Sequence, residues 1–461
     1  MEVGRWQLGI VCALLVSISA SADSGRDAIT EASVRAHLEF LASDALNGRG
    51  SGTRDEWLAA EYIGSQLRLW GVEPLGDNGG YVQTIDIERT QLAGPPVMTF
   101  GGSRFTHGTE ILVGSMSAIR HSGALVRHQD GTRTAGAAVL MPEGATPAQV
   151  AAIADAAILL VAETPQARSQ WATAASRPVS LGARFAAVAG TDTTRPARVT
   201  LDKLSYAHVA GLPDGTAISL EGKAAPPART QTWNAVGRLK GRDGERASEA
   251  ILLSAHLDHL GHRSPRGGAA AADADTIYNG ADDDASGCVA VLELARAIAT
   301  GKRPRRTIIF AFFGSEEAGG HGSRYFAEKS PVPLPQIVAN LQFEMIGRPD
   351  PAVPPQTLWL TGFERSNLGP SLARRGARLV QDPHPTQNFF FRSDNIRFAR
   401  LGVVAHTVSS YGLHKEYHTP NDETRFVDYR HMTNAIRSMV KPIEWLANSK
   451  FRPEWVPGQK P

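Results

Sequence analysis

The sequence predicts an α/β protein with a mostly parallel central sheet, helices on both faces of that sheet, and an inserted β-rich domain. From Asn234 onward, short apolar runs alternate with helix-like segments, which is the pattern of parallel strands joined by helical crossovers. The run 307–313 is continuously apolar, as is typical of a strand buried on both faces. The length of 461 residues exceeds what one ordinary core organises, so a second domain is expected.

The expected elements follow in order along the chain. Residues 29–75 are predicted to form two helices, because Ala59, Ile63 and Leu67 recur at helical spacing in the second. A further helix is predicted over 285–300. Strands are predicted at 251–255, 307–313, 357–361 and 403–408, and a last helix is expected from Tyr429, bent at Pro442.

The stretch from about Asp86 to Lys223 has a different character. Short apolar pieces alternate there with Gly, Thr, Arg and Pro, and a Pro-rich linker, A-A-P-P-A-R, follows it. We interpret it as a β-rich domain inserted into the main domain. The predicted division is a leader at 1–22, the first part of the main domain at 23–111, the insert at 112–228 and the rest of the main domain at 229–461.

Composition narrows the classes of partner and chemistry. A formal charge of +2 is too small to indicate a nucleic acid or an anionic membrane as a partner, and the basic run 302–306 is expected to be a solvated loop. Outside the leader, Cys288 is the single cysteine in the sequence. It falls on the apolar face of a predicted helix, which favours a core residue over a nucleophile.

The first 22 residues have the features of a secretory signal. Arg5 provides a weak positive start, residues 8–18 are apolar, and the sequence A-S-A gives a cleavage pattern before Asp23. The apolar run is short for a bilayer span and no second one follows it. We therefore expect a secreted or periplasmic protein without stable membrane insertion; an uncleaved N-terminal anchor is the alternative.

Ionisable residues follow the predicted strands where each strand ends. His256 and Asp258 close the strand near 251–255, and Glu316 with Glu317 follows the strand 307–313. Because the carboxyl ends of parallel strands meet at one edge of a sheet, these side chains are expected to converge on one crevice. Taken singly, each has a simpler explanation, such as a hydrogen-bonded histidine or a solvated helix start.

Further acids and a histidine extend this group. The run G-A-D-D-D-A-S-G holds three consecutive aspartates whose repulsion is costly unless a cation neutralises it, although acids also cap helix starts. An acid in the apolar stretch L-Q-F-E-M-I-G would be expensive if unpaired. Two histidines and three carboxylates suit a pair of divalent ions of zinc type and leave Glu316 free to move protons, so a hydrolase is the leading interpretation. The five positions are His256, Asp283, Glu317, Glu344 and His418.

The order and wording of these motifs resemble the co-catalytic zinc aminopeptidase family, which also includes glutamate carboxypeptidases and glutaminyl cyclases. The resemblance covers Val34 to Thr424 except the insert, and it includes the segment H-L-E-F-L-A-S-D-A-L-N-G-R-G-S-G-T, which is similar to that of secreted members. Such members often carry a protease-associated domain before the catalytic core, where the β-rich stretch lies here. The activity that the resemblance implies is release of N-terminal residues from peptides or proteins.

The resemblance implies a role for each metal position. Asp283 bridges two Zn²⁺ ions, Glu317 and His418 complete one site, and His256 and Glu344 complete the other. Many members have aspartate where Glu344 stands, so the longer side chain of Glu344 can shift the second ion.

It also implies roles around the metals. Glu316 acts as general base and then general acid, and Asp258 orients His256 from behind. Tyr417 stabilises the developing oxyanion, Arg392 contacts the substrate, and a cis peptide bond follows Asp283.

Several alternatives stay open. A carboxypeptidase or dipeptidase needs a cation for the substrate carboxylate, for which Arg392 is the candidate, whereas a glutaminyl cyclase works with one zinc. A non-catalytic, receptor-like protein would usually have lost ligands. The triplet 389–391 is a core segment or the wall of an apolar specificity pocket. The ligand set does not require six further histidines, which we interpret as structural or solvent-facing: His259, His262, His321, His384, His406 and His414.

Overall fold

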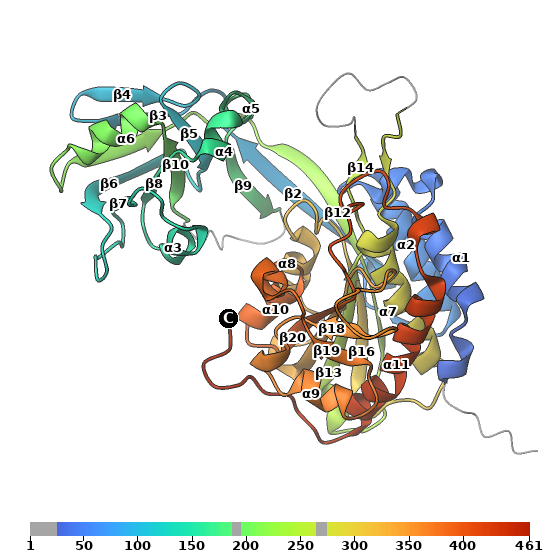
Figure 1. Cartoon of the computed structure of the whole chain (residues 1–461). Helices are drawn as coiled ribbons and strands as arrows, with labels where there is room; N and C mark the ends of the chain where they lie inside the picture. The colour runs from blue at the N-terminus through green and yellow to red at the C-terminus, as the bar shows by residue number, and fades with distance from the viewer. Residues whose placement is uncertain (1–24, 187–194, 264–273) are drawn as a thin grey trace, which may run out of the picture.

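The computed structural model describes residues 25–186, 195–263 and 274–461. The predicted leader at 1–22 lies outside the described residues. Two large sheets organise the chain (Figure 1), one of ten strands and one of eight.

The ten-stranded sheet has a parallel centre and antiparallel flanks. Four neighbouring strands, β16, β13, β17 and β20, run parallel. On one side β18 is antiparallel to β20 and parallel to β19, and on the other side β12, β2 and β9 pair antiparallel in turn. The predicted α/β class is confirmed. The bounds are β1 Glu73–Pro74, β2 Val82–Gln91, β9 Ser180–Phe185, β12 Ala228–Leu239, β13 Ala250–His256, β16 Thr307–Phe313, β17 Ile337–Phe343, β18 Leu358–Leu360, β19 Leu379–Gln381 and β20 Ala405–Ser409.

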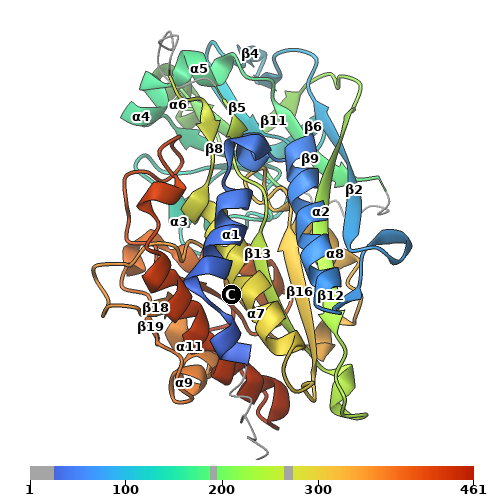
Figure 2. The same cartoon turned by 90° about the vertical axis from the view of Figure 1, so that its right-hand side faces the viewer.

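Helices cover both faces of this sheet, and Figure 2 shows the face covered by α1, α2, α7 and α11. Alternate residues of β13 explain the two layers: Ile251 and Leu253 pack into the core under these helices, whereas Leu252 packs into the core on the opposite face, under α8 and α10. Each fully buried side chain of this kind stabilises the fold by roughly 1.5–3 kcal/mol. The bounds are α1 Glu31–Leu41, α2 Arg54–Leu69, α7 Gly287–Ala299, α8 His321–Glu328, α9 Leu368–Ala373, α10 Asn395–Arg400 and α11 Tyr429–Asn448.

The eight-stranded sheet belongs to a second domain, which spans residues 97–221 and has its own core around Leu125, Ile158 and Val199. Its strands are β3 Val97–Phe100, β4 Ser103–Thr106, β5 Ile111–Ser115, β6 Arg120–Arg127, β7 Ala138–Leu140, β8 Ile158–Ala162, β10 Ala197–Leu201 and β11 Ala217–Glu221. Its helices are α3 Pro147–Ala152, α4 Pro165–Ser169, α5 Trp171–Ala175 and α6 Lys203–Ala210.

The predicted start of this domain at residue 112 is too late. The strands β3 and β4 and the first residue of β5 precede that residue, yet all three strands pair within the second sheet. The sequence does not reveal this, because β3 pairs with β11 and β5 with β10, each far along the chain. The strand β9 departs in the other direction, since it leaves the second domain to extend the main sheet beside β2.

The chain enters and leaves the second domain through neighbouring strands. The long strands β2 and β12 pair over eight residues, and a bridge between Leu92 and Ala224 continues the contact beyond them. A short hairpin, β14 Gly261–His262 with β15 Ile277–Tyr278, follows β13. Within the described ranges, no helix is long and apolar enough to cross a membrane.

Candidate metal centre

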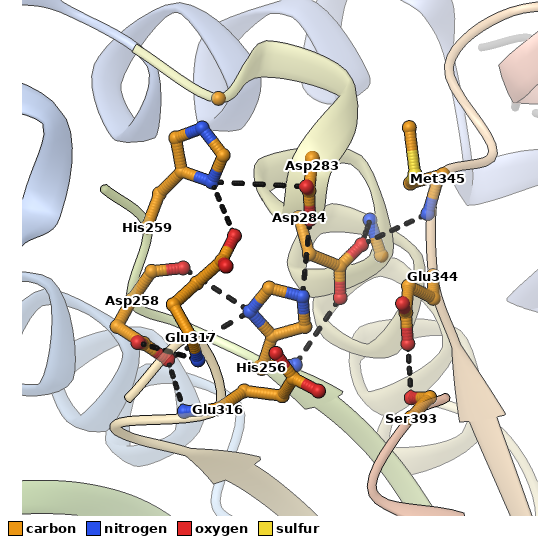
Figure 3. A network of polar contacts seen from close by, with 12 residues as sticks. His256, Asp258, His259, Asp283, Asp284, Glu316, Glu317, Glu344, Met345 and Ser393 are labelled. Carbon is orange, nitrogen blue, oxygen red and sulfur yellow. Dashed lines mark hydrogen bonds and ion pairs between the residues drawn. The ribbon is translucent and has the colours of Figure 1, made fainter. Parts of the chain in front are cut away.

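The ionisable side chains meet at the carboxyl edge of the parallel strands, as the sequence predicted (Figure 3). His256 is the last residue of β13, and Glu344 directly follows β17. Glu316 and Glu317 follow β16, which lies on the other side of β13. The crossover order of these strands therefore positions residues that are far apart in the sequence.

Three of these turns contain left-handed backbone at a residue other than glycine. Ser315, just before Glu316, has φ 53°, Met345, just after Glu344, has φ 51°, and His418 itself has φ 55°. Such conformations cost of order 1–3 kcal/mol each and cluster at functional sites. Here each lies at or beside a candidate ligand.

The three consecutive aspartates have different partners. Asp284 accepts hydrogen bonds from the backbone of His256, Gly287 and Met345, and so caps the start of α7. Asp282 accepts from the backbone of Gly347 and contacts His414. The backbone of the run is held in turn by Asp422, whose carboxylate accepts from the amides of Asp282 and Asp283.

The remaining aspartate, Asp283, faces the histidines, and each of its carboxylate oxygens contacts one of them. Its Oδ1 lies 3.2 Å from Nε2 of His256, and its Oδ2 lies 3.1 Å from Nε2 of His418. The His418 nitrogen is also 3.1 Å from Oε1 of Glu317. The peptide bond from Asp283 to Asp284 is cis, as the family resemblance implied. One carboxylate thus faces two separate groups of side chains, as a ligand shared by two cations would.

His259 joins this cluster, and the sequence did not assign it there. The residue is fully buried, and its Nδ1 lies 2.9 Å from Oε1 of Glu317 and 3.8 Å from Oδ2 of Asp283. Ligand atoms of these three residues all lie within 4.8 Å of one another. The expectation of a solvent-facing histidine is wrong for this position, and the acids around His259 make it a candidate ligand. Its place three residues after His256, at the same strand end, was the signal that could have found it.

The short contact between His259 and Glu317 lacks the direction of a hydrogen bond. Both ring nitrogens of His259 and the Oε1 of Glu317 are buried without a hydrogen-bond partner among the described residues. Two ligands of one cation behave in this way, because their lone pairs point at a shared position and not at each other. Zinc bonds of about 2.0–2.1 Å give tetrahedron edges of about 3.3 Å, close to the 2.9–3.8 Å found here. The residues present therefore fit a divalent cation.

The other half of the cluster contains His256 and Glu344. The Nδ1 of His256 contacts the backbone oxygen of Asp258 at 3.1 Å, and the Oγ of Ser393 donates a short hydrogen bond to Glu344. Burial raises the pKa of Glu344 to about 7. In the first half burial also favours a neutral carboxyl, but His259 and His418 outweigh it and lower the pKa of Glu317 to about 2.

A comparison with known sequences and structures identifies this region. Residues 234–441 match the model of peptidase family M28. These residues form an M28 peptidase domain.

Curated relatives match the chain over short stretches. The leupeptin-inactivating enzyme 1 of Streptomyces exfoliatus is 38% identical over 81 residues, which is 17% of this chain and 18% of that protein. The probable lipoprotein aminopeptidase LpqL of Mycobacterium tuberculosis is 29% identical over 138 residues, or 29% of this chain and 25% of that protein. The alignments thus span a quarter or less of these two relatives.

Solved structures match over nearly the whole chain. An aminopeptidase from Aneurinibacillus sp. strain AM-1 is 18% identical with a TM-score of 0.52, and 94% of this chain and 96% of that chain are covered. The zinc aminopeptidase BSAP from Bacillus subtilis is 17% identical with a TM-score of 0.50, and the coverage is 92% and 96%. At these identities the likeness supports the shared fold.

Beside this cluster of the M28 domain, Asp258 lies differently from the expected arrangement. Its carboxylate was expected to accept from the ring of His256, but Oδ1 lies 3.7 Å from Nδ1. It accepts instead from the backbone amides of Glu316 and Glu317 and from the hydroxyl of Ser51. Asp258 therefore fixes the loop that presents both glutamates, while its backbone oxygen contacts His256.

Glu316 lies on this loop beside His256 in Figure 3. Burial raises the pKa of its carboxyl well above the ordinary value, and Asp394 and Glu344 add to the increase, whereas His256 opposes it. A carboxyl with a raised pKa is suited to exchange protons near neutral pH.

Tyr417 and Arg392 line one small pocket next to Glu344. The ring of Tyr417 stacks on His418 with centroids 3.8 Å apart, and the Arg392 guanidinium lies over Phe389 at 4.9 Å. The pocket wall that holds Phe389 is apolar, with Met345 and Trp359 beside it. Phe389 is thus both largely buried and a wall residue of this pocket, whereas Phe390 packs into the core and Phe391 is exposed.

Most other histidines of the M28 domain are bound to nearby groups. His406 contacts the backbone oxygen of Thr361 and the hydroxyl of Ser366, and His384 contacts Asp350. His262 is exposed beside Thr276. Cys288 is buried beneath the cluster and contacts the backbone oxygen of His256, as a core residue would.

Proposed function

We propose that this chain is an exported, zinc-dependent aminopeptidase that releases N-terminal residues from peptides or proteins. The observation that carries the proposal is Asp283, whose two carboxylate oxygens face His256 and His418 from opposite sides. The M28 match and the relatives that are named aminopeptidases support the same reaction class. The leader features of residues 1–22 support export.

Two Zn²⁺ ions would be held by this chain. Asp283 would be shared, with Glu317, His418 and His259 on one side and His256 and Glu344 on the other. Zinc in such a centre makes water more acidic and polarises the scissile carbonyl. Burial of the ligands and the fixed loop of Glu316 and Glu317 would set the geometry in advance.

Glu316 would carry the proton. Its carboxylate accepts a proton from the attacking water and delivers it to the leaving amine, so the residue ends each cycle in its starting state. The hydroxyl of Tyr417 would donate to the carbonyl oxygen as negative charge develops there. Because the pocket beside Glu344 has apolar walls, it would receive the side chain of the N-terminal residue.

The excess of carboxylates at the centre suits a substrate with a free α-ammonium. Glu316, Glu344 and Asp394 lie near one another, and each has a pKa raised first by burial and then by acidic neighbours. A cationic group relieves this repulsion. The second domain would be a protease-associated-type insertion into the catalytic domain.

The test is hydrolysis of aminoacyl-p-nitroanilides and of matched peptides with free or acetylated N-termini. The purified mature protein is compared with a chelated sample and with Glu316→Gln. Cleavage restricted to free N-termini, and lost in both comparisons, is the expected result. Cleavage from the C-terminus would favour a carboxypeptidase, and cyclisation of N-terminal glutamine with one bound zinc would favour a glutaminyl cyclase. A protein that neither binds zinc nor turns over would be a binding protein.

A further inference from the structure

A second cavity lies where the second domain meets the M28 domain. It has a volume of about 390 Å³ and is lined on one side by β9 and the end of β5, and on the other by residues of α8 and α10. Figure 1 shows β9 above these two helices. The two sides are in direct contact, because Arg324 of α8 donates to the backbone oxygen of Ala183 and its guanidinium lies over the ring of Phe185.

The lining of this cavity is strongly basic. Three arginines line it, Arg195, Arg324 and Arg397, together with one acid, Glu328. Glu328 is already paired with Arg324 at 2.8 Å. Within residues 25–186, 195–263 and 274–461, the guanidinium of Arg397 makes no hydrogen bond or ion pair. Burial lowers the pKa of Arg397 and the neighbouring Arg324 lowers it further, with Arg195 adding to the decrease, whereas Asp394 opposes it. A partly buried positive group with these neighbours is stabilised by an anion.

His321 provides a second, independent indication of a ligand. It lines the same cavity and is 8% exposed, yet neither of its ring nitrogens has a hydrogen-bond partner among the described residues. Burial lowers the pKa of His321 to about 4, with Arg89 and Arg324 contributing. The ring is therefore neutral near pH 7 and offers one N–H donor. Buried polar groups without partners are uncommon, which indicates that a ligand atom satisfies this one.

The cavity is continuous with the loop that presents the proposed general base. Gly319, which lines the cavity, donates its backbone amide to the backbone oxygen of Glu316. On the other side, the amide of Arg397 donates to the backbone oxygen of Asp394, an acid that raises the pKa of Glu316. The basic cavity and the proposed base thus share one loop, and none of the residues that line this cavity also lines the apolar pocket beside Glu344.

We propose that this cavity, the arginine cleft, binds a carboxylate on the leaving part of the peptide substrate. The inference rests on the proposed function, because it gives a binding site for the part of the peptide substrate beyond the cleaved bond. Arg397 and Arg195 would hold the carboxylate from the two domains, and His321 would donate to it. The enzyme would then favour short peptides with a free C-terminus, or peptides with an acidic side chain just beyond the cleaved bond.

The first measurement is binding of peptides to the zinc-loaded Glu316→Gln protein by titration calorimetry. Leucyl peptides with one to three glycines are compared as free acids and as C-terminal amides. One length is expected to bind about tenfold or more tightly as the acid, the strength of a charge-assisted hydrogen bond. Arg397→Gln is expected to abolish this preference without weakening the amide, and Arg400→Gln, an exposed neighbour on α10, is the matched control.

The two sources of a carboxylate are separated by a second series. Amidated peptides carrying glutamate are compared with those carrying glutamine at the same position. If glutamate restores tight binding, the cleft binds a side-chain carboxylate. If only the free C-terminus restores it, the cleft binds the C-terminal carboxylate and so selects peptides by length. Arg195→Gln, on the other wall, gives a second variant in case Arg397→Gln does not fold.

The proposal would be overturned by equal binding of acid and amide at every length together with equal binding of the glutamate and glutamine peptides, or by a preference that survives both arginine variants. Hydrolysis of leucine p-nitroanilide by the unmutated protein is measured alongside. Its absence would contradict the proposed function, whereas the binding experiment would still decide the role of the cleft.

Discussion

The two halves of the candidate metal centre hold their acids in different ways. Glu317 lies between His259 and His418, and its pKa is lowered to about 2 because these neighbours outweigh burial. Glu344 contacts Ser393, and burial raises its pKa to about 7. From the protein groups alone, the first half is an ion-paired cluster and the second contains an acid that is about half protonated near pH 7.

The two halves differ in how well their ligand atoms are positioned before a cation binds and in how much charge their acids carry. The Glu317 half brings four ligand atoms from four separate points of the chain to edges of 2.9–3.8 Å, so little rearrangement is needed on binding. The Glu344 half relies on one histidine, the shared aspartate and an acid that gives up a proton. We therefore expect the Glu317 half to bind its cation more tightly, which the following changes can break or sharpen.

The substitution with the largest expected effect leaves both halves of the centre intact. Glu316→Gln removes the proton acceptor while keeping the size of the side chain, so kcat is expected to fall about 10²–10⁴-fold. Metal content, measured by plasma mass spectrometry, should stay at the wild-type value. Loss of metal in this variant would mean that Glu316 is a ligand and not the general base.

The next change removes the histidine that the sequence did not reveal as a site residue. His259→Ala should lower the affinity of the Glu317 half for its cation by about 100-fold or more. Loss of a group that only hydrogen-bonds a ligand already lowers metal affinity about 10–100-fold, and loss of a ligand should cost at least as much. Competition with a fluorescent chelator measures the two affinities separately. His262→Ala, an exposed histidine three residues on, is the control. Unchanged affinities in His259→Ala would show that this ring is only a packing residue.

A matching change addresses the other half. Ser393→Ala removes the hydroxyl that donates to Glu344, and we expect a loss of about 10–100-fold in the affinity of that half alone. The same chelator competition should show the Glu317 half unchanged. Equal weakening of both sites would contradict the independence of the two halves.

Acid is expected to weaken metal binding. Burial alone would lower the pKa of His418, but Asp283 and Glu317 outweigh burial and raise this pKa to about 9. The His418 ring is therefore mostly protonated at pH 8 and must lose its proton to bind zinc. Affinity should fall about tenfold per displaced proton for each unit from pH 8 to pH 7. Calorimetry in two buffers of different ionisation enthalpy counts the released protons, and release of none would contradict this assignment.

The smallest expected effect concerns Cys288 beneath the cluster. Burial raises the pKa of its thiol well above the ordinary value, and the side chain is about 1% exposed. The folded protein should therefore resist iodoacetamide at pH 8 and react only when denatured. Intact-mass measurement before and after denaturation checks this, and rapid modification of the native protein would contradict it.

The sequence predicted the position of the centre better than its contacts. His256 ends β13, and Glu316, Glu317 and Glu344 follow β16 and β17. The order of the parallel strands was enough to bring them together. His259 was missed because the direction of a side chain in a strand-end loop depends on backbone that the sequence does not display. Their functional roles remain predictions.

Similar limits explain the two other differences. Asp258 was expected to contact the ring of His256 through its carboxylate, but three donors from distant segments, including Ser51, hold that carboxylate elsewhere. The start of the second domain was misplaced because β3 and β5 reveal their sheet only through pairing partners about 90 to 120 residues away. Both are consequences of long-range contacts.

The paired strands β2 and β12 have a consequence for how such a protein changes over generations. Because the chain leaves and returns at adjacent points, at Leu92 and Ala224, a whole domain can be exchanged there without displacing the strands that carry the metal ligands. One wall of the arginine cleft would be replaced in the same event. Exchange of the second domain by recombination can then change substrate preference, while the residues proposed to carry the reaction stay the same.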